Sequence, residues 1–212
     1  MKVNKAKTAS FDIDPQNGFT PVCPDELPVE GGHQIAPFLN AQAEFARIRV
    51  VSQDAHTPHS IWKTDDENPS FSPVDGQNVD IRWNMHCVPG TKGFELIDGL
   101  PKPTDYDFIV YKGVAPDMHP YGACYHDLGD TLSTGVIEYL KQNEIETVIC
   151  GGLATDYCVK LTVLQLLKAG FEVVVNLEAC RGIAEETITQ ALNEMATQGA
   201  ILIQSATELT NN

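Results

Sequence analysis

Cys158 is the residue of this sequence best placed to act as a nucleophile. It follows the glycine pair Gly151-Gly152 and opens a run in which apolar residues recur at helical spacing as far as Gly170. The N-terminus of a helix has unpaired N–H groups and the positive end of the helix dipole, and both favour a thiolate over a thiol. The same N–H groups could bind a developing oxyanion. The alternative is that Cys158 is a structural core residue, because cysteine is among the most buried residue types and often serves as a small apolar residue.

A carboxylate and an ammonium group belong to two other predicted strands. Asp14 ends the strand predicted at 8–14, and Lys112 directly follows the strand predicted at 106–111. A thiol needs a base to become a nucleophile, and a leaving amine needs an acid. Asp14 could serve as both if Lys112 and Cys158 set its pKa, in which case the three groups titrate together. Each also has a plain alternative, a turn-capping carboxylate for Asp14 and a solvated surface residue for Lys112.

A second cluster has the residue types of an open metal site. Asp54 and His56 stand two positions apart where an extended segment ends, so their side chains point the same way. With His86 they form an Asp/His/His set that leaves room for water or substrate, as catalytic zinc and iron sites do. His59 is left open between a fourth ligand, a partner of a ligand and an exposed loop residue, of which the last two are favoured. Cys87 could in principle be a ligand too, but it is expected to turn into the core.

These groups are positioned by strands that alternate with helices. Strands are predicted at 8–14, 48–53, 106–111, 147–150, 172–177 and 200–203, and helices at 34–46, 133–142 and 185–198. A further helix is predicted to have Cys158 in its first turn and to stop at Gly170. Gly151 and Gly152 are expected to end their strand in a sharp turn, with Thr155 or Asp156 as the N-cap of the next helix. The connection from 55 to 105 contains both tryptophans and three histidines, and connections of this length are often functional.

This alternation predicts an α/β fold: a doubly wound, mainly parallel β-sheet flanked by helices on both faces. In such sheets ligands bind beyond the carboxyl ends of the strands. Asp14, Asp54, Lys112 and the turn before Cys158 all stand at such ends. The sequence therefore predicts that they face one crevice.

Composition narrows the class of protein. A chain of 212 residues suits one compact domain, and a formal net charge of −15 argues against nucleic acid or an anionic membrane as partner. We expect neither a signal peptide nor a membrane-spanning segment, because the first residues lead directly into a predicted strand and no apolar run has membrane-spanning length. Six cysteines are thinly spread without a Cys-x-x-Cys pair, which favours reduced thiols in a cytoplasmic protein over a disulfide framework.

Five segments taken together resemble the nicotinamidase/pyrazinamidase branch of the isochorismatase-like cysteine hydrolases. They are 14–19 (DPQNGF), 54–59 (DAHTPH), 86–91 (HCVPGT), 111–113 (YKG) and 152–159 (GLATDYCV). Each segment is short, but together they span nearly the whole chain. The resemblance implies a single isochorismatase-like hydrolase domain over residues 1–212.

The resemblance also implies roles for individual residues. Asp14, Lys112 and Cys158 would be the catalytic triad, and a cis peptide bond before Ala154 would turn the N–H groups of Ala154 and Cys158 toward one oxyanion. A divalent metal would be bound by Asp54, His56 and His86. Zn²⁺ is the first choice for this metal, with Fe²⁺ and Mn²⁺ as alternatives.

The implied reaction is hydrolysis of nicotinamide to nicotinate and ammonia through a cysteine thioester, and of pyrazinamide to pyrazinoate by the same steps. The implied partner is therefore a small molecule, and a homo-oligomer is left open. The substrate pocket is assigned to five residues, although core packing is an equal alternative for Tyr121. These residues are Phe19, Trp83, Tyr121, Leu153 and Tyr157.

Three positions depart from the family pattern. Asp12 stands where relatives have an apolar strand residue, and it shares a face with Asp14. Gly18 replaces the usual aspartate, and Ala55 the usual tryptophan. These changes bear on the shape of the pocket and the preferred amide more than on the chemistry.

Two other functions compete with this interpretation. A metal-independent amidohydrolase of the same fold, acting on an N-carbamoyl or ureido compound, would keep the cysteine triad but not the Asp/His/His set. A non-catalytic α/β binding module would use the metal only structurally. Isochorismatase itself is disfavoured, because that reaction does not need Cys158.

Overall fold

The computed structural model describes residues 1–211 and is built on a six-stranded sheet in the order β4-β3-β2-β5-β6-β7. Every neighbouring pair in this sheet is parallel, as the sequence predicted. Its strands are β2 (Thr8–Ile13), β3 (Ile48–Asp54), β4 (Phe108–Lys112), β5 (Thr147–Leu153), β6 (Glu172–Arg181) and β7 (Ile201–Ile203). A second, short pair joins the two ends of the chain, β1 (Lys2–Val3) with β8 (Thr210–Asn211).

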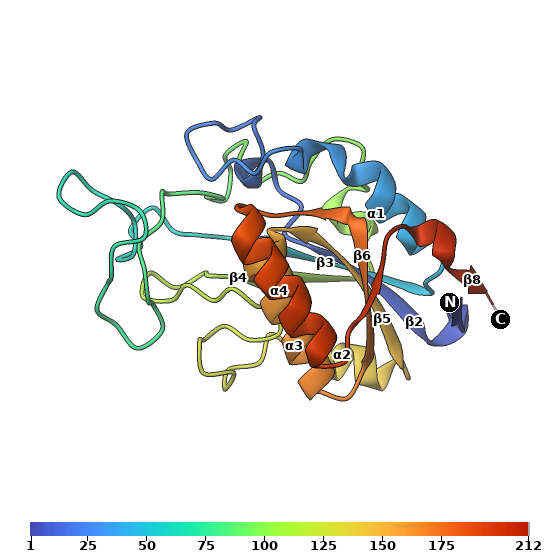
Figure 1. Ribbon diagram of the computed structural model, residues 1–212. Helices are drawn as coiled ribbons and strands as arrows, with labels where there is room; N and C mark the ends of the chain where they lie inside the picture. Colours follow the sequence, from blue (N-terminus) through green and yellow to red (C-terminus); the bar gives the residue numbers. More distant parts are fainter. Residues whose placement is uncertain (212) are drawn as a thin grey trace.

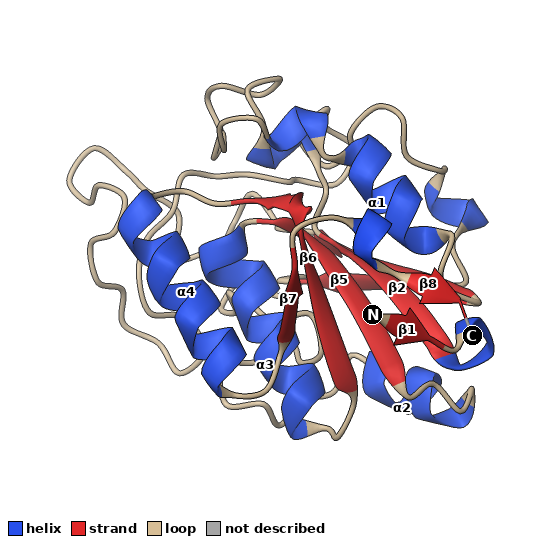
Figure 2. Cartoon of the chain, turned by 45° about the vertical axis from the view of Figure 1, so that its right-hand side comes forward, coloured by secondary structure: helices blue, strands red, loops and turns tan. Residues whose placement is uncertain are grey.

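Helices cover both faces of the sheet (Figures 1 and 2). The α-helices are α1 (Ala36–Ala43), α2 (Val136–Gln142), α3 (Lys160–Lys168) and α4 (Glu185–Thr197). One π-helical turn, η5 (Thr155–Val159), precedes α3, and five 3₁₀ turns lie at Lys5–Lys7, Asn17–Phe19, Gly32–Gln34, Pro103–Asp105 and Ala206–Glu208. Helix α1 packs on one face, and α2, α3 and α4 pack on the other.

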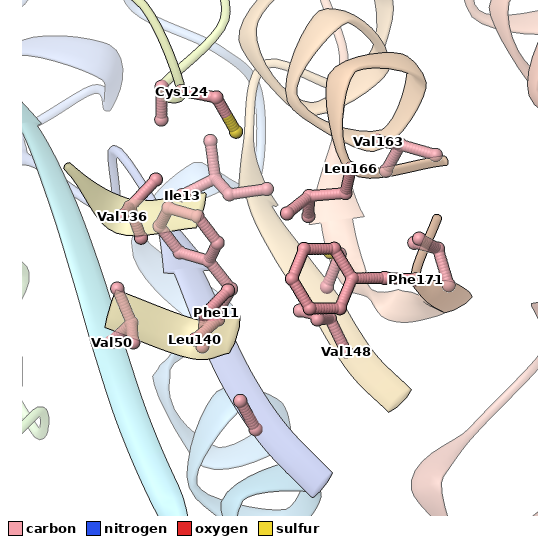
Figure 3. Close-up of a cluster of buried hydrophobic side chains, with 14 of the residues drawn as sticks. Phe11, Ile13, Val50, Cys124, Val136, Leu140, Val148, Val163, Leu166 and Phe171 are labelled. Carbon is pink, nitrogen blue, oxygen red and sulfur yellow. The ribbon is translucent and has the colours of Figure 1, made fainter. Parts of the chain in front are cut away.

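The main core lies between the sheet and the α2–α3 side. Figure 3 shows side chains of β2 and β5 meeting those of α2 and α3. Phe11 and Ile13 of β2 alternate with polar residues, so they share the face that contacts Leu140 and Leu166, and all four are completely buried. Burying each such side chain stabilises the fold by about 1.5–3 kcal/mol. This core fixes β2 against β5, the two strands whose ends carry Asp14 and the Cys158 turn.

The glycine pair Gly151-Gly152 does not end β5, contrary to the prediction. The strand continues through both glycines to Leu153, because they allow close packing where a side chain would not fit. A Cβ on Gly151 would lie 2.7 Å from the Ala179 Cβ, and one on Gly152 would lie 1.9 Å from the Ile13 carbonyl oxygen. The glycines therefore bring β5 against its neighbours directly behind the site.

The predicted N-cap at Thr155 or Asp156 is also wrong. Ala154 precedes the π-helical turn. The Asp156 carboxylate instead accepts hydrogen bonds from the Ile183 N–H (3.1 Å) and the Thr187 hydroxyl (2.5 Å). Asp156 thus ties the turn that carries the cysteine to the start of α4.

The boundaries of two helices and one strand differ from the predicted ones. The helix predicted at 34–46 is α-helical only from Ala36 to Ala43, and the helix predicted at 133–142 begins at Val136, after Gly135 with φ +88°. The strand predicted at 172–177 runs on to Arg181, because β6 resumes pairing with β5 after a register shift.

The topology explains why one end of the sheet is the functional end. Successive connections from β2 lead through β3 to β4 on one side, whereas β5, β6 and β7 lie on the other, so the strand order reverses between β2 and β5. Ligands bind at such a reversal, beyond the carboxyl ends of the strands. The connection from 55 to 105 extends at the end opposite the two termini (Figure 1). Among the described residues, no helix is both long and apolar enough to cross a bilayer.

Asp12 forms a buried ionic cluster beneath the site. Its Oδ2 accepts hydrogen bonds from the Arg49 Nε and the Tyr106 hydroxyl, both at 2.9 Å, and its side chain is 0% exposed. Burial raises the pKa of Asp12 to about 6, although the Arg49 charge and the Tyr106 hydrogen bond act in the opposite direction. Asp12 therefore anchors β2 to β3 and to the start of the β4 segment.

This pKa gives a testable pH dependence. Because the folded-state pKa lies above the ordinary value of 3.8, protonation of Asp12 favours the folded state. The contribution is complete below pH 4 and is lost as the pH rises through 6. We expect the free energy of unfolding of the wild type, minus that of Asp12→Asn, to increase by up to roughly 3 kcal/mol between pH 7.5 and pH 4. Urea unfolding at several pH values measures it, and a difference that stays flat would contradict the assignment.

Candidate active site

Four neighbouring strands bring the predicted chemical groups to one place. Asp14 follows β2, Asp54 ends β3, Lys112 ends β4, and Cys158 lies in η5 just after β5. Asp54 and Lys112 are register partners across β3 and β4. Residues up to 144 positions apart, as Asp14 and Cys158 are, therefore share one edge of the sheet.

Lys112 is the centre of the catalytic cluster. Its Nζ lies 3.0 Å from Asp14 Oδ2 and 3.6 Å from the Cys158 sulfur, and it forms an ion pair with Asp54 Oδ1. It also donates to the Pro120 carbonyl oxygen at 3.3 Å. The side chain is 0% exposed, so the alternative of a solvated surface lysine does not apply.

Ser52, which sequence reasoning missed, orients Asp14. Its hydroxyl donates to Asp14 Oδ1 at 2.6 Å, and the Asp14 N–H donates to the Ser52 carbonyl oxygen at 3.1 Å. Asp14 has φ +45°, a conformation that side chains rarely adopt and that the surrounding bonds enforce. Oδ2 is left buried beside Lys112 without a hydrogen-bond donor of its own. Asp14, Asp54 and Cys158 each have one potential ligand atom within 4.8 Å of the others, which puts a carboxylate close to the thiol that it could deprotonate.

Burial and charge set the protonation states. Burial raises the pKa of the Cys158 thiol well above its ordinary value, and the Lys112 charge only partly opposes this, so the resting group is a thiol. The sequence had suggested a thiolate, since it did not show how deeply the turn is buried. Burial also raises the pKa of Asp14, against the Lys112 charge. For Lys112 itself, burial disfavours the ammonium, but Asp14 and Asp54 outweigh it and raise the pKa well above the ordinary value.

The Asp/His/His set converges beside this cluster. Asp54 Oδ2 lies 3.4 Å from His56 Nε2 and 3.7 Å from His86 Nε2. The opposite ring nitrogens are held by backbone carbonyl groups, His56 Nδ1 by Gly113 at 3.1 Å and His86 Nδ1 by Asn84 at 2.7 Å. His56 Nε2 has no hydrogen-bond partner among the described residues. A carboxylate and two imidazoles with their Nε2 atoms turned together fit a divalent cation.

Gln16 was also missed, and it holds the backbone of Asp54, the carboxylate residue of this set. Its side-chain amide donates to the Asp54 carbonyl oxygen at 2.9 Å and accepts from the Asp54 N–H at 2.7 Å. The amide thus continues the pairing of β3 as another strand would. No local sequence signal marks this contact, because the two residues are 38 positions apart.

His119 is the third omission. It lies in the loop after β4, and a ligand atom of His119 lies within 4.8 Å of ligand atoms of His56 and His86. By contrast, His59 is exposed, as favoured from the sequence, and Cys87 is buried in the core as expected.

A cavity connects the cysteine to the Asp/His/His set. Four of the five predicted pocket residues line it, namely Phe19, Trp83, Tyr121 and Tyr157, together with Asp54, His86, Ala154 and Cys158. Leu153 does not line it. Its side chain is 0% exposed and packs in the apolar cluster with Phe19 and Leu39, because it belongs to the last residue of β5 and points under α1. Leu27, Val29, His119 and Ile183 complete the wall and were not predicted.

Tyr121 is fixed in the wall by polar contacts. Its hydroxyl donates to Asp80 Oδ1 at 2.7 Å and accepts from the Trp83 Nε1–H at 3.1 Å. The ring of Trp83 meets that of Tyr157 edge-on, with centroids 5.1 Å apart. The wall is therefore a set of aromatic rings held in fixed orientations, suited to a flat ring as ligand.

The departure at position 18 has a structural counterpart. A Cβ on Gly18 would lie 2.3 Å from Glu26 Oε2, so the Glu26 carboxylate occupies the space that a side chain at 18 would need. Glu26 Oε2 also accepts from the Cys87 N–H at 2.8 Å, next to His86. Glu26 therefore supports the segment that presents His86.

The peptide bond between Leu153 and Ala154 is cis. The Ala154 carbonyl oxygen accepts from the N–H groups of Tyr157 and Val159, both at 3.1 Å. Within residues 1–211, the Ala154 N–H has no hydrogen-bond acceptor, and Ala154 lines the cavity.

Gly113 provides a sharp test of the metal site. A Cβ at this position would lie 2.2 Å from His56 Cε1, so Gly113→Ala should displace the His56 ring. We expect at least about a tenfold loss of zinc affinity, since disturbing the partners of metal ligands typically has that effect. Gly199→Ala is the matched control, because Gly199 also has a positive φ but has nothing within 4 Å of its Cβ position. Zinc titration against a chelator measures both variants, and equal affinities would contradict the assigned role of His56.

Comparisons of the sequence and of the fold with known proteins give matches over nearly the whole chain. The model of the isochorismatase domain matches residues 8–207. A nicotinamidase of Acinetobacter baylyi is 34% identical over 198 residues, covering 91% of this chain and 90% of the relative. The solved structure of an Acinetobacter baumanii nicotinamidase/pyrazinamidase is 32% identical, with a TM-score of 0.87 over 96% of this chain and 98% of that one. A Pyrococcus horikoshii pyrazinamidase solved in complex with zinc is 29% identical, with a TM-score of 0.74 over 93% and 99% of the two chains.

Proposed function

The chain belongs to the isochorismatase domain family, and from that premise we propose that it is a nicotinamidase, which hydrolyses nicotinamide to nicotinate and ammonia and acts likewise on pyrazinamide. The observation that carries this proposal is the convergence of Asp14, Lys112 and Cys158 with the Asp/His/His set around one aromatic cavity. The triad of Asp14, Lys112 and Cys158 suits hydrolysis of an amide bond. The Asp/His/His set beside an aromatic cavity suits binding of a pyridine ring.

In the first half-reaction Cys158 is the nucleophile and Asp14 the base. Asp14 Oδ2 takes the thiol proton as the sulfur attacks the carboxamide carbon. The N–H groups of Ala154 and Cys158 bind the developing oxyanion. When the tetrahedral intermediate collapses, Asp14 returns the proton to the leaving nitrogen, the C–N bond breaks, and ammonia and a thioester remain.

In the second half-reaction water replaces the sulfur. Asp14 removes a proton from a water molecule that attacks the thioester carbon, and the same N–H groups bind the second oxyanion. The C–S bond breaks, Asp14 returns its proton to the cysteine, and the released acid gives up its remaining carboxyl proton to solvent to become nicotinate. One water is consumed for each amide hydrolysed. Throughout, the buried ammonium of Lys112 offsets the charges of Asp14 and Asp54.

We assign the divalent cation to Asp54, His56 and His86. Zn²⁺ is our first choice, because imidazole nitrogen and carboxylate oxygen suit it and because a related pyrazinamidase was solved with zinc; Fe²⁺ and Mn²⁺ are alternatives. These three residues would hold an ion whose chemistry would be to bind the pyridine nitrogen and so orient the ring. Phe19, Trp83, Tyr121 and Tyr157 then enclose the ring and exclude water.

The proposal extends to the domain organisation, the location and the partner of the protein. One sheet with its covering helices takes up nearly the whole chain, which supports a single catalytic domain over residues 1–212. Six free cysteines support a reducing, cytoplasmic location, and a net charge of −15 supports a small-molecule partner over nucleic acid.

A product balance tests this function against its nearest rival. The purified zinc-loaded enzyme should release ammonia and nicotinate from nicotinamide in a 1:1 ratio, and should be inactive on an N-carbamoyl amino acid. The reverse preference, together with protein that binds no stoichiometric metal, would favour the metal-independent amidohydrolase. No turnover of either compound would favour the binding module.

A further inference from the structure

We infer that His119 is a fourth protein ligand of the divalent cation, so that three histidines and one carboxylate form the site. The inference extends the proposed metal site and rests on it, but it does not depend on which amide is hydrolysed. It concerns a residue from the loop after β4, outside the Asp/His/His set that the sequence indicated.

The first observation is that His119 is buried without polar partners for its ring. The residue is 4% exposed, and neither Nδ1 nor Nε2 has a hydrogen-bond partner among the described residues. Buried polar atoms are nearly always paired, so two unpaired nitrogens in one ring call for an explanation. A bound cation supplies a partner for one of them.

The second observation is where the ring lies. Ligand atoms of His56, His86 and His119 lie within 4.8 Å of one another, and the ring centroid of His119 is 5.1 Å from that of His56 and 5.7 Å from that of His86. His56 Nε2, which faces Asp54, is likewise buried and unpaired within residues 1–211. Unpaired imidazole nitrogens from two different loops therefore border one small volume beside a carboxylate.

The surroundings hold His119 in this position. Its backbone N–H donates to the Asn78 carbonyl oxygen at 2.8 Å, and the carbonyl oxygen of Met118 accepts from Trp62 Nε1 at 3.1 Å. Trp62 meets the His119 ring edge-on at 4.4 Å, and Trp83 lies parallel to it at 6.0 Å. The ring is thus fixed by backbone and aromatic contacts, while its nitrogens remain available.

The competing explanation is that His119 is only an aromatic wall residue that touches the substrate ring, since it lines the cavity. His119→Phe separates the two, because phenylalanine keeps a flat ring of similar size and removes both nitrogens. His59→Phe is the matched control, since His59 is an exposed histidine on the 55–105 connection that also carries His56 and His86. His119→Gln is a second variant that retains a polar side chain if phenylalanine impairs folding.

The experiment measures metal binding without substrate. Metal-free wild type and variants are titrated with Zn²⁺ in competition with a chromophoric chelator, and the visible absorption of the Co²⁺-loaded proteins is recorded. We expect His119→Phe and His119→Gln to weaken zinc binding by about 100-fold or more, because loss of a ligand should exceed the 10–100-fold typical of its supporting partners. The Co²⁺ bands should change in both, and His59→Phe should match the wild type. Thermal unfolding of the metal-free proteins checks that each variant is folded.

Wild-type zinc affinity and unchanged Co²⁺ bands in both His119 variants would overturn the inference, and a raised KM for nicotinamide would then identify a wall residue. A wild type without stoichiometric metal would overturn it as well. If zinc binding depends on His119 but the enzyme releases no ammonia from nicotinamide, the proposed substrate is wrong and the inference stands.

Discussion

Replacing Cys158 by alanine is expected to lower kcat for ammonia release from nicotinamide by at least about 10³-fold. The reason is that residues acting as one catalytic unit lose nearly all of the shared effect when a single member is removed. Here the sulfur is the atom that bonds to the carboxamide carbon, and the 3.6 Å contact with Lys112 places it in the same cluster as the base. The rate is measured with an ammonia-coupled assay at saturating nicotinamide.

Two controls make this result specific. Cys23→Ala removes a thiol that lines neither the cavity nor the core, and it should keep the wild-type rate. Zinc affinity of Cys158→Ala should also stay at the wild-type level, because Cys158 is not among the proposed metal ligands. A Cys158→Ala enzyme that turns over at the wild-type rate would remove the covalent mechanism.

Replacing Lys112 by methionine is expected to have the largest combined effect on stability and activity. Methionine has a similar length but no charge, so Asp14 and Asp54 are left buried without the ammonium that contacts both. Removing one partner of a buried ion pair typically costs about 3–5 kcal/mol of stability. The pKa of Asp14 should rise further, since the Lys112 charge lowers it, and activity should fall by several orders of magnitude. Urea unfolding and the ammonia assay measure the two losses.

A double variant separates charge balance from catalysis. Lys112→Met combined with Asp14→Asn removes one buried carboxylate along with the ammonium, so it should regain part of the lost stability. It should remain inactive, because the base is missing. A double variant that is no more stable than Lys112→Met would show that the destabilisation comes from packing, contrary to the role assigned to Lys112.

The residues that stand at strand ends could be placed from the sequence because two rules suffice for them. Parallel strands present their carboxyl ends at one edge, and that edge carries Asp14, Asp54, Lys112 and the Cys158 turn. The i and i+2 spacing of Asp54 and His56 likewise fixes their common direction, with 3.4 Å between Oδ2 and Nε2 in the structure. Local pattern and topology are enough for this part of the site.

The residues that support the site could not be found in this way. Ser52 and Gln16 act through hydrogen bonds to residues 38 positions away, and His119 comes from a loop without periodic pattern. The glycine pair was misjudged for a related reason. A pair of glycines is common in turns, whereas here Gly152 is required because the Ile13 carbonyl oxygen lies where its Cβ would be. Close approach between distant segments leaves no signature in the local sequence.

The central claim is that a thiol at Cys158 forms an acyl-enzyme while Asp14 shuttles the proton. Rapid mixing of enzyme with excess nicotinamide, followed by acid quench, measures ammonia, nicotinate and the mass of the peptide containing Cys158 in the same samples. We predict that ammonia appears before nicotinate, by an amount that approaches the concentration of active sites, and that a nicotinoyl group is found on Cys158. Ammonia and nicotinate appearing together, with no acyl group on Cys158 at any quench time, would contradict the account.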